Sequence, residues 1–250
     1  NTVTGNAGQW HAMTVSSFGE GVGSQLTTHV TDNVVRNNSS GGMSVGGGSF
    51  VVSGNEILNN VAASEVDGGG LFVGPIAGTA TTTDNLIKGN SGRWGGGIRA
   101  NAFSDTSTSG TVTVSNNRVI GNAANRGGGI YVPDSGGTLV VSNNIVHGNS
   151  VSGNPMNGLA PDGAALWLEA KTTGLSVTNN SVTGNTGTST IFVYCPEAIS
   201  GCGTDWLRTP VLVDNNLVDN ATTYWLYNGH REESDAVNAE NNWWGTNSDG

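Results

Sequence analysis

The sequence predicts an all-β solenoid, in which one short structural unit repeats along the whole chain. The main observation is the motif Asn-x-(Val/Ile/Leu)-x-x-Asn, whose two asparagines stand five residues apart. Successive copies start 22 to 36 residues apart, and a fixed unit with variable spacers is typical of a solenoid whose insertions leave on the outside. The copies begin at Asn1, Asn33, Asn55, Asn85, Asn117, Asn144, Asn180, Asn215 and, with Trp244 at its centre, Asn242.

The second observation is a set of short apolar runs between turn residues. In residues 127–149, a first strand is expected at 127–132, a second at 139–142 and a third at 145–147, with turns at 133–137 and 143–144. Alternation with a period of two places Val, Ile and Leu inside and the middle residue outside. First strands recur at 43–45, 71–73, 98–100, 166–168 and 191–193, and second strands at 50–52, 112–114, 175–177 and 211–213.

Three strands and three turns per repeat predict a parallel β-helix of triangular cross-section, because no stretch carries the apolar stripe of a helix. The unbroken repeat favours a single domain over residues 1–250, with about eight rungs, a rung being one turn of the solenoid. Equivalent residues of successive rungs are then about 4.8 Å apart.

The motif asparagines are expected to act structurally. Stacked at one corner, each side-chain amide can bond to the next, and asparagine tolerates the left-handed conformation that a sharp corner requires. Glycines before the first strand allow close backbone packing at another corner. A ligand-binding role for the asparagines is the alternative.

Composition limits the partners. Only 11% of the 250 residues are charged and the net charge is −10, so the surface is expected to repel nucleic acids and anionic membranes. No apolar stretch approaches the length of a membrane span. No cofactor is expected, and no metal site, because the four histidines fall at different places in their rungs.

The two cysteines, Cys195 and Cys202, stand seven residues apart in a loop that contains proline and glycine. This setting predicts a disulfide formed in an oxidising compartment, with two separate thiols as the alternative. Together with the abundance of Ser, Thr, Asn and Gly, it indicates an extracellular or cell-surface location. Because the chain opens inside a repeat unit, we expect it to be a fragment of a longer surface protein.

The run Gly-Gly-Gly-Ile at 127–130, followed by Asn-Asn-x-Val-x-x-Asn at 143–149, resembles the right-handed parallel β-helix repeats of secreted and surface bacterial proteins. These include autotransporter passengers, the polymorphic outer-membrane adhesins and the pectin-lyase-like superfamily. Residues 241–245, Asn-Asn-Trp-Trp-Gly, resemble segments that close such domains. The resemblance covers the chain and implies a right-handed fold, but it leaves activity open, because this fold carries lyases, hydrolases, epimerases, adhesins and inert stalks.

The outward residues of the first strands are predicted to form one column across the rungs. Exposed aromatics in a row indicate either sugar stacking, with Arg99 fixing orientation, or docking of another chain or a flanking domain. The structural alternative is that the insertions at 150–163 and 194–209 cover the column. In rung order the column runs Thr14, Ser44, Phe72, Arg99, Tyr131, Trp167 and Phe192, and then Trp225 or Leu226.

Charged residues beside this column suggest a possible active site. Asp134 and Glu169 follow strands of adjacent rungs, and glycoside hydrolysis needs two carboxylates roughly 5 to 9 Å apart. A uronate lyase needs a base and cations, for which Arg99 and Arg126 are candidates. Asp67, Arg93, Arg126 and Asp162 are expected in loops leading into the column. However, scattered acids on an acidic surface are usually solvated.

Threonine-rich runs at 79–83 and 106–113 suggest ice binding. That function needs threonine columns on one flat face, and the two runs are predicted to lie mostly in loops.

The leading functional hypothesis is an extracellular structural or adhesive solenoid within a larger cell-surface or fibre-forming protein. Its partners would be flanking domains or other copies, placed end to end. The alternative is a polysaccharide lyase, a glycoside hydrolase or a glycan-binding module that uses the column. A trimer that buries the column between chains is a third possibility.

Overall fold

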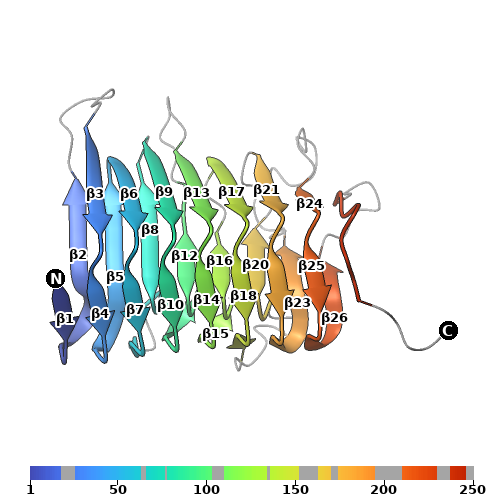
Figure 1. Cartoon of the computed structure of the whole chain (residues 1–250), viewed down its shortest axis with the longest axis horizontal. Coiled ribbons are helices and arrows are strands. Elements are labelled where there is room, and N and C mark those ends of the chain that lie inside the picture. Colours follow the sequence, from blue (N-terminus) through green and yellow to red (C-terminus); the bar gives the residue numbers. More distant parts are fainter. Residues whose placement is uncertain are drawn as a thin grey trace.

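The computed structural model describes residues 1–17, 26–62, 66–76, 78–102, 110–133, 136–151, 163–169, 174–194, 210–229 and 237–245. These residues form strands and turns arranged in three parallel sheets, which we name A, B and C (Figure 1). This part of the chain holds no helix with the length and apolar character needed to cross a membrane.

Sheet A consists of the segments between the paired asparagines. Its neighbouring strands align the central residues of the motif, as in Val35 beside Ile57 and Ile87 beside Val119. In order the strands are β1 (Thr2–Thr4), β4 (Val34–Arg36), β7 (Glu56–Leu58), β10 (Leu86–Lys88), β14 (Arg118–Ile120), β18 (Ile145–His147), β22 (Ser181–Thr183) and β25 (Asn216–Val218).

Sheet B contains the predicted first strands. They are β2 (Ala7–Ser17), β5 (Ser39–Gly47), β8 (Leu71–Pro75), β12 (Ile98–Ala100), β16 (Ile130–Val132), β20 (Leu166–Glu169), β23 (Thr186–Tyr194) and β26 (Ala221–Asn228). Three short strands of this sheet were not predicted: β11 (Ser91–Trp94), β15 (Ala123–Arg126) and β19 (Ser150–Val151). Each rung crosses three sheets, as predicted, but in the middle rungs the segment in sheet B is divided into two strands, such as β11 and β12. In a later rung the single strand β23 takes the place of both.

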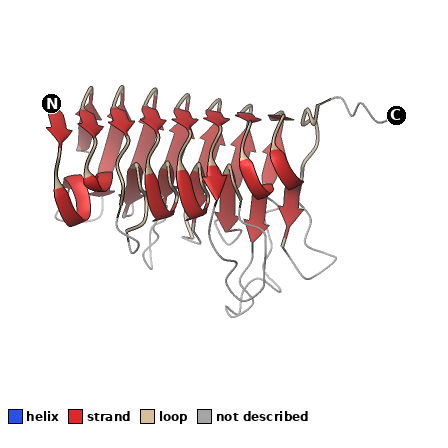
Figure 2. Cartoon of the chain, turned by 90° about the horizontal axis from the view of Figure 1, so that it is seen from below, coloured by secondary structure: helices blue, strands red, loops and turns tan. Residues whose placement is uncertain are grey.

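Sheet C contains the predicted second strands together with two strands that were not predicted, β3 and β9. In order the strands are β3 (Thr27–Thr31), β6 (Ser49–Ser53), β9 (Thr79–Thr83), β13 (Thr111–Ser115), β17 (Thr138–Ser142), β21 (Leu175–Thr178) and β24 (Val211–Val213). The chain visits sheets A, B and C in turn, and Figure 2 shows the successive turns stacked along one axis. Sheet A has eight strands, which confirms the prediction of a parallel β-helix of about eight rungs.

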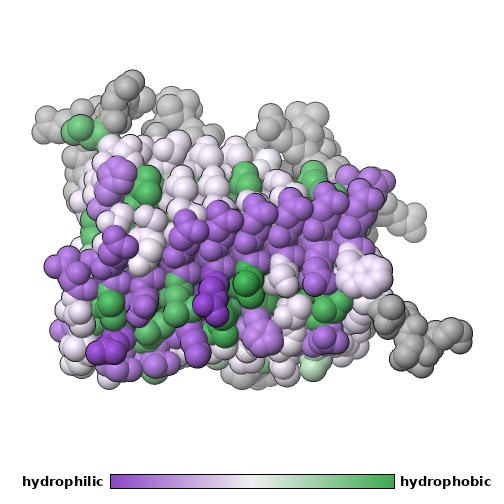
Figure 3. Space-filling model, viewed as in Figure 1, coloured by the Kyte–Doolittle hydropathy of each residue, from purple (hydrophilic) through white to green (hydrophobic). Residues whose placement is uncertain are grey.

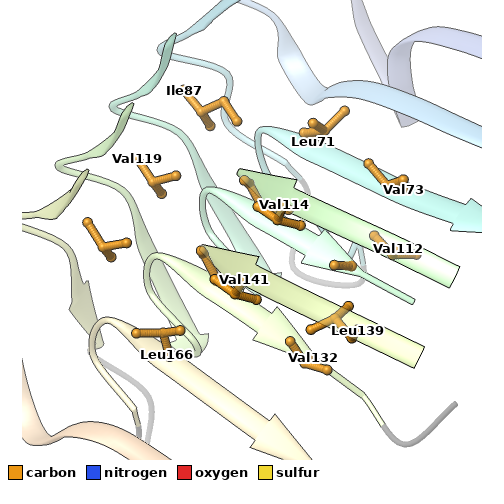
Figure 4. Close-up of a cluster of buried hydrophobic side chains, with 14 of the residues drawn as sticks. Leu71, Val73, Ile87, Val112, Val114, Val119, Val132, Leu139, Val141 and Leu166 are labelled. Carbon is orange, nitrogen blue, oxygen red and sulfur yellow. The ribbon is translucent and has the colours of Figure 1, made fainter. Parts of the chain in front are cut away.

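The core is the column of inward side chains from all three sheets (Figure 4). Val112 and Val114 of β13 point inward with Val119 of β14, and all three are fully buried. This confirms the predicted alternation for these strands. Burying one such side chain contributes about 1.5 to 3 kcal/mol, and every rung repeats the contribution.

Two ladders of asparagine side chains run along the solenoid. The ladder side chains of the inner rungs are buried, and each Nδ2 donates to the Oδ1 of the next asparagine over 2.8 to 3.1 Å, as in Asn38 to Asn60 and Asn117 to Asn144. The amides also donate to backbone carbonyls of the preceding rung, such as Asn85 to Val52. The predicted corner stacking is thus confirmed. Among the described residues, one ladder runs from Asn1 to Asn242 and the other runs from Asn6 to Asn220.

The left-handed conformation belongs to a different residue from the one that we predicted. Every ladder asparagine after Asn1 follows a Gly, Asn or Asp with a positive φ, such as Asn116 at 56° before Asn117. The ladder asparagines themselves do not have a positive φ. One residue therefore turns the chain, and the next joins the rungs.

The glycines before the first strands allow the predicted close packing. A Cβ on Gly97 would lie 2.6 Å from the carbonyl oxygen of Gly129 on the next rung, and one on Gly70 would lie 2.6 Å from that of Gly97. Backbone therefore occupies the space of a side chain at this corner.

Candidate functional site

The outward residues of sheet B form the predicted column. Strand register pairs Thr14 with Ser44, and then joins in turn Phe72, Arg99, Tyr131, Trp167 and Phe192. The eighth member is Tyr227, so the prediction of Trp225 or Leu226 was wrong. Leu226 pairs with the inward Ile191, and Trp225 stacks on Trp244 near the last rung. We call the set Phe72, Arg99, Tyr131, Trp167, Phe192 and Tyr227 the aromatic column.

The centre of the aromatic column is buried, whereas the sugar-stacking interpretation requires an exposed row. Tyr131, Trp167 and Phe192 are only 2%, 5% and 3% exposed, and they form a hydrophobic cluster separate from the solenoid core. The ring centroids of Trp167 and Phe192 are 4.3 Å apart, and those of Phe192 and Tyr227 are 5.4 Å apart. Such contacts each contribute about 0.5 to 1.5 kcal/mol beyond the area that they bury.

An ionic cluster lies beside the first half of the column. The Arg99 guanidinium pairs with the carboxylate of Asp67, and Arg93 Nε lies 3.4 Å from Asp67 Oδ1. Burial raises the pKa of Asp67, while Arg99 and Arg93 act in the opposite direction. Arg93 lies in the short strand β11 and Arg126 ends the short strand β15, which corrects the expectation that both lie in loops.

Trp94 is the residue of this site that the sequence analysis missed. Its ring lies 3.9 Å from the guanidinium carbon of Arg93, 5.5 Å from that of Arg126 and 5.8 Å from that of Arg99. Arg126 also lies 4.8 Å from the ring of Trp167. Three arginines thus surround one indole in cation–π geometry. The Arg-Trp pair directly before a glycine run was the available sequence signal.

Three of the candidate catalytic residues, Arg99, Arg126 and Glu169, make contacts with other side chains of the site. The hydroxyl of Tyr131 donates to Glu169 Oε1 over 2.7 Å. Burial, followed by the negative charge of Glu169, raises the pKa of Tyr131 well above its ordinary value, so the phenol remains protonated. Asp134 lies outside the described residues, and the spacing of the Asp134–Glu169 pair therefore stays a prediction. Asp162, Cys195 and Cys202 also lie outside them.

His11 was also missed as a neighbour of the column. Its ring lies 6.2 Å from that of Phe72, and its Nε2 is 3.0 Å from the carbonyl oxygen of Gly68. Burial lowers the pKa of His11 below its ordinary value, against the opposing effects of Gly68 and Asp67. Within the described ranges, no three His, Cys, Asp or Glu side chains come together as a metal site would need.

At the centre of the aromatic column, most polar and charged groups already have partners within the protein. Charged groups pair with each other, the phenol is bonded, and the largest rings are covered. Trp167 Nε1 is buried without a hydrogen-bond partner among the described residues. The partly accessible members are at the two ends, with Phe72 and Arg99 at one end and Tyr227 at the other.

Comparison with known proteins gives the family. The model of a family described as "right handed beta helix region" matches residues 1–182, which is more than half of the chain. No curated protein and no solved structure matches the chain. The match agrees with the three parallel sheets and with the resemblance of the repeats. The chain belongs to the right-handed β-helix family.

Proposed function

We propose that the chain is an extracellular structural or adhesive β-solenoid, one segment of a larger cell-surface or fibre-forming protein. The observation that carries this proposal is the mutual pairing of polar groups in the aromatic column. Arg99 pairs with Asp67, and the Tyr131 hydroxyl bonds to Glu169. A ligand would have to replace these contacts before it could bind or exchange a proton. Family membership adds support, because β-helix domains are often extracellular or surface-associated.

The ladders support a role as a rigid rod. Hydrogen bonds of all three sheets and of both asparagine ladders join one rung to the next, so they run along the solenoid axis. Bending the rod would stretch the bonds on one side of every rung. A solenoid of this kind keeps what it carries at a fixed distance from its attachment point.

The proposed extracellular location and the expected lack of activity on polysaccharides can be tested together. Antibodies against the chain should label intact cells of the source organism, and protease treatment of those cells should remove the label. Incubation of the chain with polyuronates and with neutral polysaccharides should release no products. Labelling only after permeabilisation contradicts the proposed location, and release of new reducing ends or unsaturated uronates contradicts the structural role.

End-to-end contact with flanking domains or further copies is part of the same proposal. Parallel strands at the edge of a solenoid carry backbone groups that can pair with another strand. Light scattering of the purified chain across a range of concentrations should show growing assemblies if copies stack. A monomer at every concentration counts against stacking of copies and leaves flanking domains as the partners.

Glycan recognition at the end of the aromatic column is the second candidate. Tyr224 is 46% exposed, and its ring lies 5.3 Å from that of Tyr227, the last member of the column. An accessible pair of aromatic rings is a suitable platform for a sugar ring. On a glycan array, Tyr224→Ala should weaken any binding, while Trp243→Ala, an exposed tryptophan outside the column, should not. Unchanged binding in Tyr224→Ala would remove this candidate.

A further inference from the structure

The outer face of sheet C carries hydroxyl side chains at most positions. The run Thr79–Thr83 forms strand β9, and Thr111–Ser115 forms strand β13. The prediction that these threonines lie mostly in loops was therefore wrong for residues 79–83. In the run 106–113, residues 111–113 belong to β13, and residues 106–109 lie outside the described part. In each strand the side chains of first, third and fifth positions point outward, while the residues between them are buried.

Strand register arranges these side chains in three columns along the solenoid, which we call the hydroxyl face. The first column contains Thr27, Ser49, Thr79, Thr111 and Thr138. The third contains Thr31, Ser53, Thr83, Ser115, Ser142 and Thr178, followed by Val213. The middle column contains His29, Val51, Thr81, Thr113, Val140, Ser176 and Val211.

The hydroxyl face is accessible and uncharged. All its side chains are half-buried or exposed, and none of them is Asp, Glu, Lys or Arg, although the chain has a net charge of −10. None of them is Trp, Tyr or Phe. Figure 3 shows this region as a pale surface next to a band of polar residues, which follows the corner between sheets C and A. A neutral face of this composition is complementary to a neutral lattice of hydrogen-bonding groups.

The face is also flat and stiff. Sheets of many strands usually twist, and flat ones are held by stacking or by side-chain ladders. The asparagine ladder that includes Asn85 and Asn117 runs along the edge of this sheet, and Figure 1 shows its strands side by side in nearly one direction. Threonine has a restricted χ1 angle, so little side-chain entropy is lost on contact. The seven strands span roughly 29 Å, since neighbouring strands are about 4.8 Å apart.

We propose that the hydroxyl face binds ice. Its rung repeat of about 4.8 Å is close to the repeat of oxygen atoms within the layers of ice. Threonine methyl groups restrict the orientation of the water above them, and the hydroxyls between them anchor that water by hydrogen bonds. Water ordered in this way on a flat, periodic face can join an ice lattice. Crystalline polysaccharide is the competing occupant, but its recognition relies on stacking aromatic rings, which this face lacks.

Partition of the 250-residue chain into slowly grown ice tests the proposal, with crystalline cellulose and chitin as parallel sorbents. Thr113→Lys places a charge at the centre of the face. Ser176→Lys on β21 and Ser181→Lys on β22 form a matched pair, because they make the same substitution five residues apart on different sheets. Thr113→Val removes one hydroxyl and keeps the shape of the side chain. Circular dichroism and melting temperature report whether each variant is folded.

We expect the wild-type chain and Ser181→Lys to enter the ice, and Thr113→Lys and Ser176→Lys to lose that partition. Thr113→Val should enter the ice less than the wild type. Because this variant keeps the side-chain shape, it still tests the proposal if a lysine variant fails to fold. Exclusion of the wild-type chain from ice overturns the proposal. Equal loss in Ser176→Lys and Ser181→Lys also overturns it, as does retention on cellulose or chitin without retention on ice.

Discussion

Asn117 donates two hydrogen bonds to one oxygen atom of Asn144: its backbone N–H and its side-chain Nδ2 lie 2.9 and 3.1 Å from Oδ1. The same pair of bonds joins Asn85 to Asn117 and Asn144 to Asn180. A slip of one residue between rungs would break both bonds and turn apolar side chains outward. The ladder therefore fixes the register that aligns the aromatic column and the hydroxyl face.

The residue before each ladder asparagine should tolerate glycine and reject branched side chains. Asn116 has a φ of 56° and an exposed side chain. Asn116→Val should lose about 1 to 2 kcal/mol, because a β-branched residue is strained in this conformation. Asn116→Gly should remain near the wild type. Urea unfolding followed by circular dichroism measures both, and equal losses would contradict the division of roles at the corner.

The close approach at the glycine corner should make Gly97 far less replaceable than Gly121. A Cβ on Gly97 would lie 2.6 Å from both the Gly129 carbonyl oxygen and Val119 Cγ1, whereas one on Gly121 would meet nothing within 4 Å. Gly97→Ala should cost about 3 kcal/mol through overpacking. Gly121→Ala should cost about 1 kcal/mol, from its positive φ alone. The midpoints of urea unfolding compare the two, and a smaller loss for Gly97→Ala would contradict the packing argument.

Stability should fall in mild acid through His11. Burial lowers the pKa of His11, so between that pKa and about 6.5 the unfolded chain binds more protons than the folded one. The free energy of unfolding therefore has its full His11 contribution above about pH 6.5 and loses it as pH falls through the lowered pKa. Asp67, the acidic group facing His11, opposes this effect, and Arg99 and Arg93 neutralise Asp67.

Urea unfolding at several pH values checks this dependence. His11→Gln should flatten it, and His29→Gln, which changes an exposed histidine on sheet C, should leave it intact. A pH profile that His11→Gln does not alter would show that another group is responsible.

The buried centre of the aromatic column should contribute strongly to stability. Trp167→Ala should lose about 3 to 5 kcal/mol, as expected for a buried aromatic side chain. Tyr131→Phe removes the bond to Glu169 and should lose about 1 to 2 kcal/mol. Tyr224→Ala, at a more exposed position, is the control and should lose less than either. Thermal unfolding compares the three, and a Trp167→Ala variant as stable as the wild type would contradict the contribution of this cluster to stability.

The sequence was informative wherever a residue type is required by geometry. The asparagine motif, the glycine corner and the period-two alternation were sufficient to predict the sheets, the core and most of the column. Strand β9 was hidden because its inward positions are Ala80 and Thr82, which are small yet buried, so no apolar alternation was visible. Strand β11 was missed because none of its residues is buried, and β15 because Ala124 is its one buried residue.

The column was only partly predictable. In the other rungs the glycines mark the start of the first strand, but the last rung has no such glycines. Its register was therefore predicted incorrectly, with Trp225 or Leu226 in the column in place of Tyr227. Burial of Trp167 and the gathering of arginines around Trp94 depend on contacts between side chains from different rungs. Sequence order does not specify such contacts, because long side chains can reach several neighbours.

The most direct test of the account is the free energy of urea unfolding of Asn117→Ala, measured beside Asn116→Gly. Asn117 Oδ1 accepts two bonds from Asn85, and its Nδ2 lies within 3.1 Å of the oxygens of Thr82, Ser115 and Asn144. Removal of this buried amide leaves several partners unsatisfied, and we predict a loss of about 3 kcal/mol or more. A loss no larger than that of Asn116→Gly would contradict the claim that the asparagine ladder holds the solenoid in register.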